Sequence, residues 1–167
     1  VLIGVMIAMT LEAFMILFWG WLSDIIGRRT VYAIGSVGLI VFAFPFFWLF
    51  DTHDTLLVYL ALILGLPLSH AAMIGTQPAL MGELFPTHVR YTGLAMGHEI
   101  ASIFAGGFAP LIATALFAHF QSAWPVSVML ALFGIVTTVT LLTIRQAPYR
   151  TGTVSYTHLR AHETRGN

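Results

Sequence analysis

The chain has 167 residues, of which 58% are hydrophobic and only 8% are charged, and its mean hydropathy is +0.89. Soluble domains carry about 25% charged residues, so this composition excludes an ordinary soluble surface and predicts a membrane protein. The formal net charge is zero, the chain has arginines but no lysine, and there is no cysteine. Nothing in this pattern indicates nucleic acid as a partner, a disulfide framework or a thiolate metal site.

Five apolar segments predict an all-α membrane fold with five transmembrane helices. Their approximate limits are 1–22, 30–50, 56–81, 93–118 and 125–144. Each approaches or exceeds the roughly 20 residues that a helix needs to cross the hydrocarbon core, and in lipid a helix pairs all its backbone groups internally. The first segment begins at Val1 inside an apolar run, with no charged region before it. We therefore expect a fragment of a longer protein rather than a signal peptide.

The arginines predict the orientation of these helices. Arg28 and Arg29 follow the first segment, Arg90 follows the third, and Arg145 and Arg150 follow the fifth. The other two connections, 51–55 and 119–124, contain no arginine. The positive-inside rule places the arginine side in the cytoplasm, so the bundle should also end there.

Prolines and small residues lie inside the spans. The prolines of the second to fourth segments are Pro45, Pro67, Pro78 and Pro110. We expect them to interrupt or bend their helices. Small residues recur every three or four positions in the third segment (Gly65, Ser69, Ala72, Thr76 and Ala79) and in the fourth (Ser102, Ala105, Gly106 and Ala109). Such stripes favour close packing between helices.

The sequence "GWLSDIIGRR", residues 20–29, predicts a short turn between the first two spans. Gly20 and Gly27 permit a tight turn and a close helix contact, and Asp24 can cap the start of a helix. Arg28 and Arg29 can pair with carboxylates or bind anionic headgroups. Simple anchoring would explain two arginines, but not the whole frame of glycines, aspartate and arginines at this spacing.

This motif resembles the cytoplasmic loop signature of the major facilitator superfamily. The match rests on Gly20-x-Leu22-Ser23-Asp24-x-x-Gly27-Arg28-Arg29. Two further stretches, "GELFPTHVRYTG" (82–93) and "GGFAPLIATAL" (106–116), resemble the metabolite:proton symporter branch. The resemblance implies that the five spans are helices eight to twelve of a twelve-helix fold, with the amino-terminal half as a partner absent from this chain.

The resemblance implies that the protein is a proton-coupled transporter. Members of that branch carry small polar metabolites, such as organic acids, together with protons across the bacterial cytoplasmic membrane. The expected partners are therefore a small metabolite, protons and the lipid bilayer; the driving force is the proton gradient, and no cofactor and no metal is expected. The alternative is a membrane sensor that kept the fold without transport, because fold alone does not fix function.

Three polar side chains within the spans are candidates for binding protons or substrate. Glu12 lies about 18 Å along the helix from Asp24, near the middle of the membrane. Desolvation favours a neutral carboxyl there, so Glu12 can hold and release a proton; alternatively, it is hydrogen-bonded to a neighbouring helix. His70 and Gln77 share one face of the third span, where they can contact solute or form interhelical hydrogen bonds.

"LAMGHEIAS", residues 94–102, suggests either the zinc-binding motif of a protease or a pair of functional polar side chains within a transporter helix. The box HExxH needs a second histidine where this chain has Ser102, so we reject an intramembrane metalloprotease and predict that the protein is not an enzyme. His98 and Glu99 lie in the cytoplasmic third of the fourth span, and Glu99 is expected to pair with a charge near Arg90. The predicted cytoplasmic gate comprises Gly20, Asp24, Gly27, Arg28, Arg29, Glu83, Arg90, His98 and Glu99.

The last segment, 151–167, differs in kind from the rest. It shows no apolar periodicity and resembles a translated sequencing adapter. His158 and His162 are four apart, but no further ligand accompanies them. We expect a non-native or disordered tail after a partial transmembrane bundle that spans residues 1–150.

Overall fold

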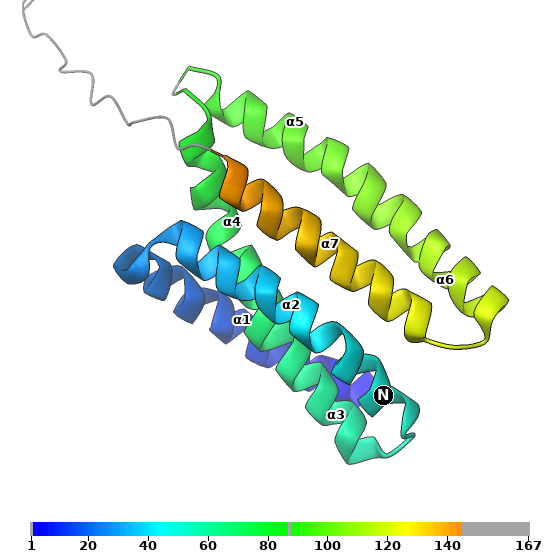
Figure 1. Ribbon diagram of the computed structural model, residues 1–167. Coiled ribbons are helices and arrows are strands. Elements are labelled where there is room, and N and C mark those ends of the chain that lie inside the picture. The colour runs from blue at the N-terminus through cyan, green and yellow to red at the C-terminus, as the bar shows by residue number, and fades with distance from the viewer. Residues whose placement is uncertain (1, 87, 145–167) are drawn as a thin grey trace, which may run out of the picture.

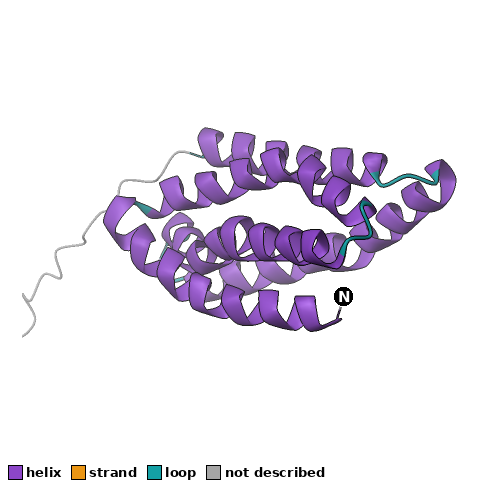
Figure 2. Ribbon diagram, turned by 90° about the horizontal axis from the view of Figure 1, so that it is seen from below, coloured by secondary structure: helices purple, strands orange, loops and turns teal. Residues whose placement is uncertain are grey.

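A computed structural model describes residues 2–86 and 88–144, which form helices joined by short connections (Figures 1 and 2). Five helical stretches are long and apolar enough to cross a membrane. They cover Leu2–Ile26, Arg28–Asp51, Thr55–Leu84, Arg90–Phe120 and Trp124–Thr143. The predicted all-α membrane fold with five spans is therefore confirmed. Arg145, Arg150 and the predicted tail 151–167 lie outside the described residues.

Three spans are single α-helices and two change helix type near the middle. The single helices are α1 (Leu2–Ile26), α2 (Arg28–Asp51) and α7 (Trp124–Thr143). The third span consists of α3 (Thr55–Leu64), the π-helical segment η1 (Gly65–His70) and α4 (Ala71–Leu84). The fourth consists of α5 (Arg90–Ser102), the π-helical segment η2 (Ile103–Phe108) and α6 (Ala109–Phe120).

The third span lies against both α1 and α2, and α2 lies between it and α7. The packing of α2 on α7 is the most extensive in the described part of the chain, and Thr138 there donates a hydrogen bond of 3.0 Å to Ser36 Oγ. The α1–α2 and α4–α5 connections share one end of the bundle with the end of α7, as Figure 1 shows. We call this the arginine end, because Arg28, Arg29 and Arg90 lie there.

The stretch 20–29 is helical almost throughout, which corrects the predicted turn. α1 continues to Ile26 and α2 begins at Arg28, so Gly27 alone is non-helical, with φ 98° and ψ 133°. Its positive φ favours glycine, because a Cβ would clash in that region. The predicted capping role of Asp24 is wrong: Asp24 lies in the last turn of α1, and Gly27, the residue before α2, leaves that helix without a side-chain cap.

The prolines affect their helices unequally. Pro45 lies within the continuous helix α2 and Pro78 within α4, so neither proline interrupts its helix, and a bend at these two positions stays a prediction. Pro67 lies inside η1, and Pro110 lies at the start of α6, directly after η2. Membrane helices tolerate proline where local changes of helix type re-pair the backbone, and the two π segments supply such changes.

The fourth span is the least buried of the five, although it contacts α4 at one end and α7 at the other. None of the residues of α5, η2 and α6 is buried, whereas Ser69, Ala72 and Thr76 of the third span are. The small residues of the third span therefore pack as predicted. The small residues of the fourth span are not buried, and a Cβ added at Gly106 would meet nothing within 4 Å.

Candidate functional site

Glu12 and His70 are brought together from different spans. They are 58 residues apart in sequence, yet Glu12 Oε1 contacts His70 Nδ1 between α1 and η1. The Glu12 side chain is 7% exposed and that of His70 is 54% exposed. A buried carboxylate needs a partner or a proton, because hydrocarbon does not solvate its charge. The contact supplies a group that can hold either the proton or the opposite charge.

The helix changes type at this contact. His70 is the last residue of η1, and the backbone N–H of the next residue, Ala71, bonds to Leu66 O with the wider spacing of a π-helix. Single π turns inside α-helices are often found at functional sites, because they re-aim side chains relative to a regular helix. His70 also lines a mostly apolar hollow with side chains of α2 and α7, including Phe42, Phe46 and Leu130.

Gln77, the third predicted member of this set, takes no part in the contact. It is half-buried in α4, and its amide forms no hydrogen bond within the described residues. The site at mid-bundle therefore consists of Glu12 and His70, and Gln77 stays a candidate for solute alone.

A cluster of charges lies at the arginine end. Arg28 bonds to Glu83 Oε1 at 2.7 Å through one guanidinium nitrogen and to Asp24 Oδ1 at 3.3 Å through the other. These contacts join the end of α1, the start of α2 and the end of α4. All three side chains are at least a third exposed, so each pair contributes only about 0.2–1 kcal/mol to stability. A weak link of this kind can open and close at little cost.

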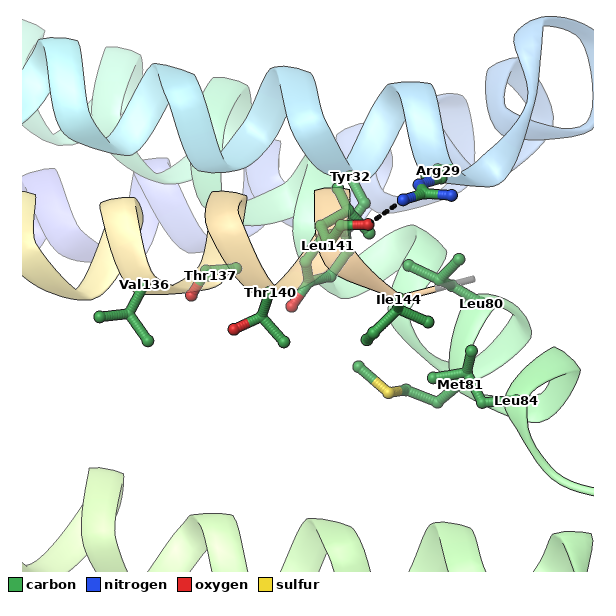
Figure 3. A pocket seen from close by; sticks show the side chains of 10 residues that line it. All are labelled: Arg29, Tyr32, Leu80, Met81, Leu84, Val136, Thr137, Thr140, Leu141 and Ile144. Carbon is green, nitrogen blue, oxygen red and sulfur yellow. Dashed lines mark hydrogen bonds between the residues drawn. The ribbon is translucent and has the colours of Figure 1, made fainter. Parts of the chain in front are cut away.

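Arg29 makes a different contact from the one predicted for it. Its guanidinium donates to the backbone carbonyl of Leu141 in the last turn of α7, as the dashed line in Figure 3 shows. Carbonyls in a last turn lack intrahelical donors, so a cation there is favourable. Arg29 also borders a pocket that is lined by Tyr32, Leu80, Met81, Leu84, Val136, Thr137, Thr140, Leu141 and Ile144 (Figure 3).

The remaining predicted gate residues are spread more widely. Arg90 begins α5 and donates from Nε to Phe85 O at 3.4 Å. His98 and Glu99 are exposed on α5 and form no side-chain hydrogen bond or ion pair with other described residues. Gly20 lies beside α4, where an added Cβ would be 3.6 Å from Gly75 O, so it serves helix contact.

Within the described ranges, no group of three or more His, Cys, Asp and Glu side chains is placed to hold a metal ion. The sequence does not predict the contact between Glu12 and His70, although it marks both residues as candidates. The sequence offered one signal for it: these are ionisable residues in otherwise apolar segments, and such residues usually face a partner or a cavity.

A comparison with protein families decides the family. Residues 1–161 match the model of the Major Facilitator Superfamily. The chain belongs to this superfamily. The predicted superfamily membership is thereby confirmed, and the chain is a multi-pass membrane protein.

Its relatives within the Major Facilitator Superfamily include named bacterial transporters. The shikimate transporter of Escherichia coli (strain K12) is 32% identical over 123 residues, which are 74% of this chain and 27% of that protein. The inner membrane metabolite transport protein YhjE of the same strain is 42% identical over 95 residues, which are 56% of this chain and 21% of that protein. The proline/betaine transporter of that strain is 30% identical over 131 residues, or 78% and 26%.

This superfamily member spans only about a quarter of the length of these relatives. No solved structure matches it.

Proposed function

We propose that this chain is the carboxyl-terminal membrane part of a secondary transporter that moves a small polar metabolite together with protons. The observation that carries the proposal is the contact of the buried Glu12 carboxyl with His70 in the middle of the bundle. We assign this pair as the proton-binding site. The proposal places the transporter in the bacterial cytoplasmic membrane, with the arginine end of the bundle in the cytoplasm.

The pair can store one proton at little electrostatic cost. With one proton shared between them, Glu12 and His70 carry no net charge, whichever of the two holds it. Removing this proton leaves a net negative charge and adding a second leaves a net positive charge, and both are disfavoured in apolar surroundings. A movement that separates the two side chains would change how tightly this proton is held.

The unequal exposure of the two side chains suggests a division of roles. Glu12 is enclosed between α1 and the third span, whereas more than half of the His70 side chain is exposed. His70 is therefore the member through which protons enter and leave, and its protonated ring is the one that a solute carboxylate can approach. The named relatives transport shikimate and proline or betaine, all of which bear a carboxylate. We propose an organic acid or a similar small carboxylate as the substrate.

The charges at the arginine end support a two-state mechanism. Arg28 links α1 and α2 to α4 through partly exposed ion pairs, each of small net worth. Alternating access needs two states that differ by only a few kcal/mol, which weak pairs of this kind can bias. We propose that this cluster closes the cytoplasmic side in one state and opens in the other.

The test uses the complete transporter that contains this segment, in proteoliposomes with labelled shikimate, proline or glycine betaine. An inwardly directed proton gradient should accelerate uptake by the unmodified protein. Glu12→Gln should lose this acceleration but keep solute exchange between the two sides, because exchange needs no net movement of protons. The control Asp51→Asn, in an exposed residue at the opposite end of α2, should behave like the unmodified protein. Equal uptake with and without the gradient by the unmodified protein would refute proton coupling.

A further inference from the structure

A side chain of α1 bonds to the backbone of η1 close to His70. Trp19 Nε1 donates to Pro67 O at 3.0 Å, and the contact is partly buried. Trp19 lies seven positions after Glu12 on the same face of α1, and Pro67 lies three positions before His70. α1 therefore holds η1 at two points, one at the side chain of His70 and one at the backbone.

The bonded carbonyl is one that the π segment has freed. In a regular α-helix, Pro67 O would accept from the N–H of Ala71. Here that N–H bonds to Leu66 O instead. Pro67 is buried, and an unpaired carbonyl in apolar surroundings is unfavourable. The indole N–H of Trp19 supplies the donor that the wider turn has taken away.

This bond favours the π form over the α form. If η1 became a regular α-helix, Ala71 would return to Pro67 O and Trp19 would lose its acceptor. A π turn holds about one more residue than an α turn, so the change would rotate one side of the helix by about 100° relative to the other. Such a rotation would carry His70 away from Glu12 or displace the packing of α4.

We call this hydrogen bond from the Trp19 indole to Pro67 O the brace. The second π segment shows that a π-helix does not generally require one. In η2 the N–H of Ala109 bonds to Phe104 O, which frees Ala105 O in the same way. No side-chain donor of the described residues bonds to Ala105 O. The segment that carries the partner of Glu12 has a brace, and the exposed one does not.

We propose that Trp19 is a positioning residue: its indole N–H keeps η1 in the π form that presents His70 to Glu12. The consequence for transport rests on the proposed proton-binding role of the pair, whereas the bond and its effect on η1 do not.

Other charged or titratable groups near these elements lie away from the pair. Tyr59 of α3 packs on Gly4, and Tyr32 of α2 packs with Leu80 and Leu141. The rest lie at the helix ends: Asp24, Arg28, Arg29 and Glu83 at the arginine end, and Asp51, His53 and Asp54 at the other. If loss of the Trp19 bond changes the pH profile of solute uptake, we therefore attribute that change to His70 and Glu12.

The first experiment tests the bond in the complete transporter, independently of any proton coupling. Solid-state NMR on protein with ¹⁵N-indole tryptophan and ¹³C-carbonyl proline should show a short Nε1-to-carbonyl dipolar coupling. This coupling should vanish in Trp19→Phe, which keeps an aromatic ring but lacks the N–H. It should remain in Trp21→Phe, a matched change of a 61% exposed tryptophan on the same helix. If Trp19→Phe leaves all such couplings unchanged, the proposed brace does not exist.

The second experiment measures the effect of the bond on the pair through the pH profile of uptake. Loss of a buried hydrogen bond of this kind should reduce the population of the paired geometry roughly tenfold. The midpoint of the Trp19→Phe profile should therefore move by up to about one pH unit, toward the profile of His70→Gln. Trp21→Phe should keep the normal profile, and Trp19→Phe should add nothing in the His70→Gln background.

A normal pH profile in Trp19→Phe, with the NMR coupling lost, would overturn the positioning role and leave the proposed transport function standing. If Trp19→Phe shifts the pH profile equally in the unmodified protein and in the His70→Gln variant, Trp19 acts independently of His70. That result would also overturn the proposal. Absence of any pH dependence in the unmodified protein would instead refute the proposed function, without bearing on the bond.

Discussion

α1 and α4 approach each other closely at Gly75, and replacing this residue by alanine tests the packing of the bundle. A Cβ at position 75 would lie 2.7 Å from Ile16 O and 3.3 Å from Gly20 N. Both neighbours are backbone atoms of α1, so no side chain can rotate away to make room. The Ile16 carbonyl oxygen would have to move about 0.7 Å away from the new Cβ to reach an ordinary van der Waals contact of 3.4 Å.

The expected cost follows from this displacement. A gap of about 0.5–1 Å removes roughly a quarter to a half of each pairwise attraction along the interface. Overpacking of this kind typically costs about 1–3 kcal/mol. Gly82→Ala is a matched control in the same helix, because its Cβ would meet only the flexible side chain of Arg90, at 3.7 Å. Both variants gain the same helix propensity, so their difference isolates the clash.

The assay is the free energy of unfolding of the protein in detergent, followed by circular dichroism during titration with a denaturing detergent. Gly75→Ala should be less stable than Gly82→Ala by about 1–3 kcal/mol. Because Glu12 lies on the displaced helix, Gly75→Ala should also weaken the contact with His70. Equal stability of the two variants would refute the close approach of α1 and α4.

Two further substitutions test single contacts. Arg28→Lys should weaken the link between Asp24 and Glu83, because an ammonium group lacks the forked guanidinium that lets one arginine bond to both carboxylates. Solute uptake should change, while the free energy of unfolding should fall by less than about 1 kcal/mol. A large loss of stability would contradict the conclusion that these ion pairs are weak. Asp54→Ala should destabilise the protein by about 1 kcal/mol, because the Asp54 carboxylate caps the first turn of α3. Asp51→Ala, which removes an exposed carboxylate that caps no helix, should leave the stability unchanged in the same unfolding assay. Equal effects of the two substitutions would contradict the capping role of Asp54.

Hydropathy predicted the number of spans correctly because each helix must pair its own backbone in lipid. It did not predict where the helices end. The apolar run of α1 stops near Leu22, but the helix continues through Ser23 and Asp24 to Ile26. Hydropathy marks the part of a helix that suits hydrocarbon, whereas the helix ends only where the backbone turns, which here requires the positive φ of Gly27.

The candidate site was predictable in its members but not in its geometry. Glu12 and His70 stand out as ionisable residues in apolar segments, but their contact depends on how α1 packs against the third span. It also depends on the π form of η1. Proline alone does not specify that form, since Pro45 and Pro78 lie in regular α-helices. The brace from Trp19 was invisible in sequence, because it depends on a carbonyl freed by the local bonding of Leu66 and Ala71.

The most direct test of the central claim is the exchange of protons when solute binds to the purified complete transporter. The protein is held in weakly buffered detergent solution with a pH-sensitive dye, and a carboxylate solute is added. Binding should change the number of bound protons by roughly one per unmodified protein, because the solute alters how the Glu12–His70 pair holds its proton. Glu12→Gln should bind solute with no such change. If the variant exchanges protons as the unmodified protein does, the Glu12–His70 pair is not the proton-binding site.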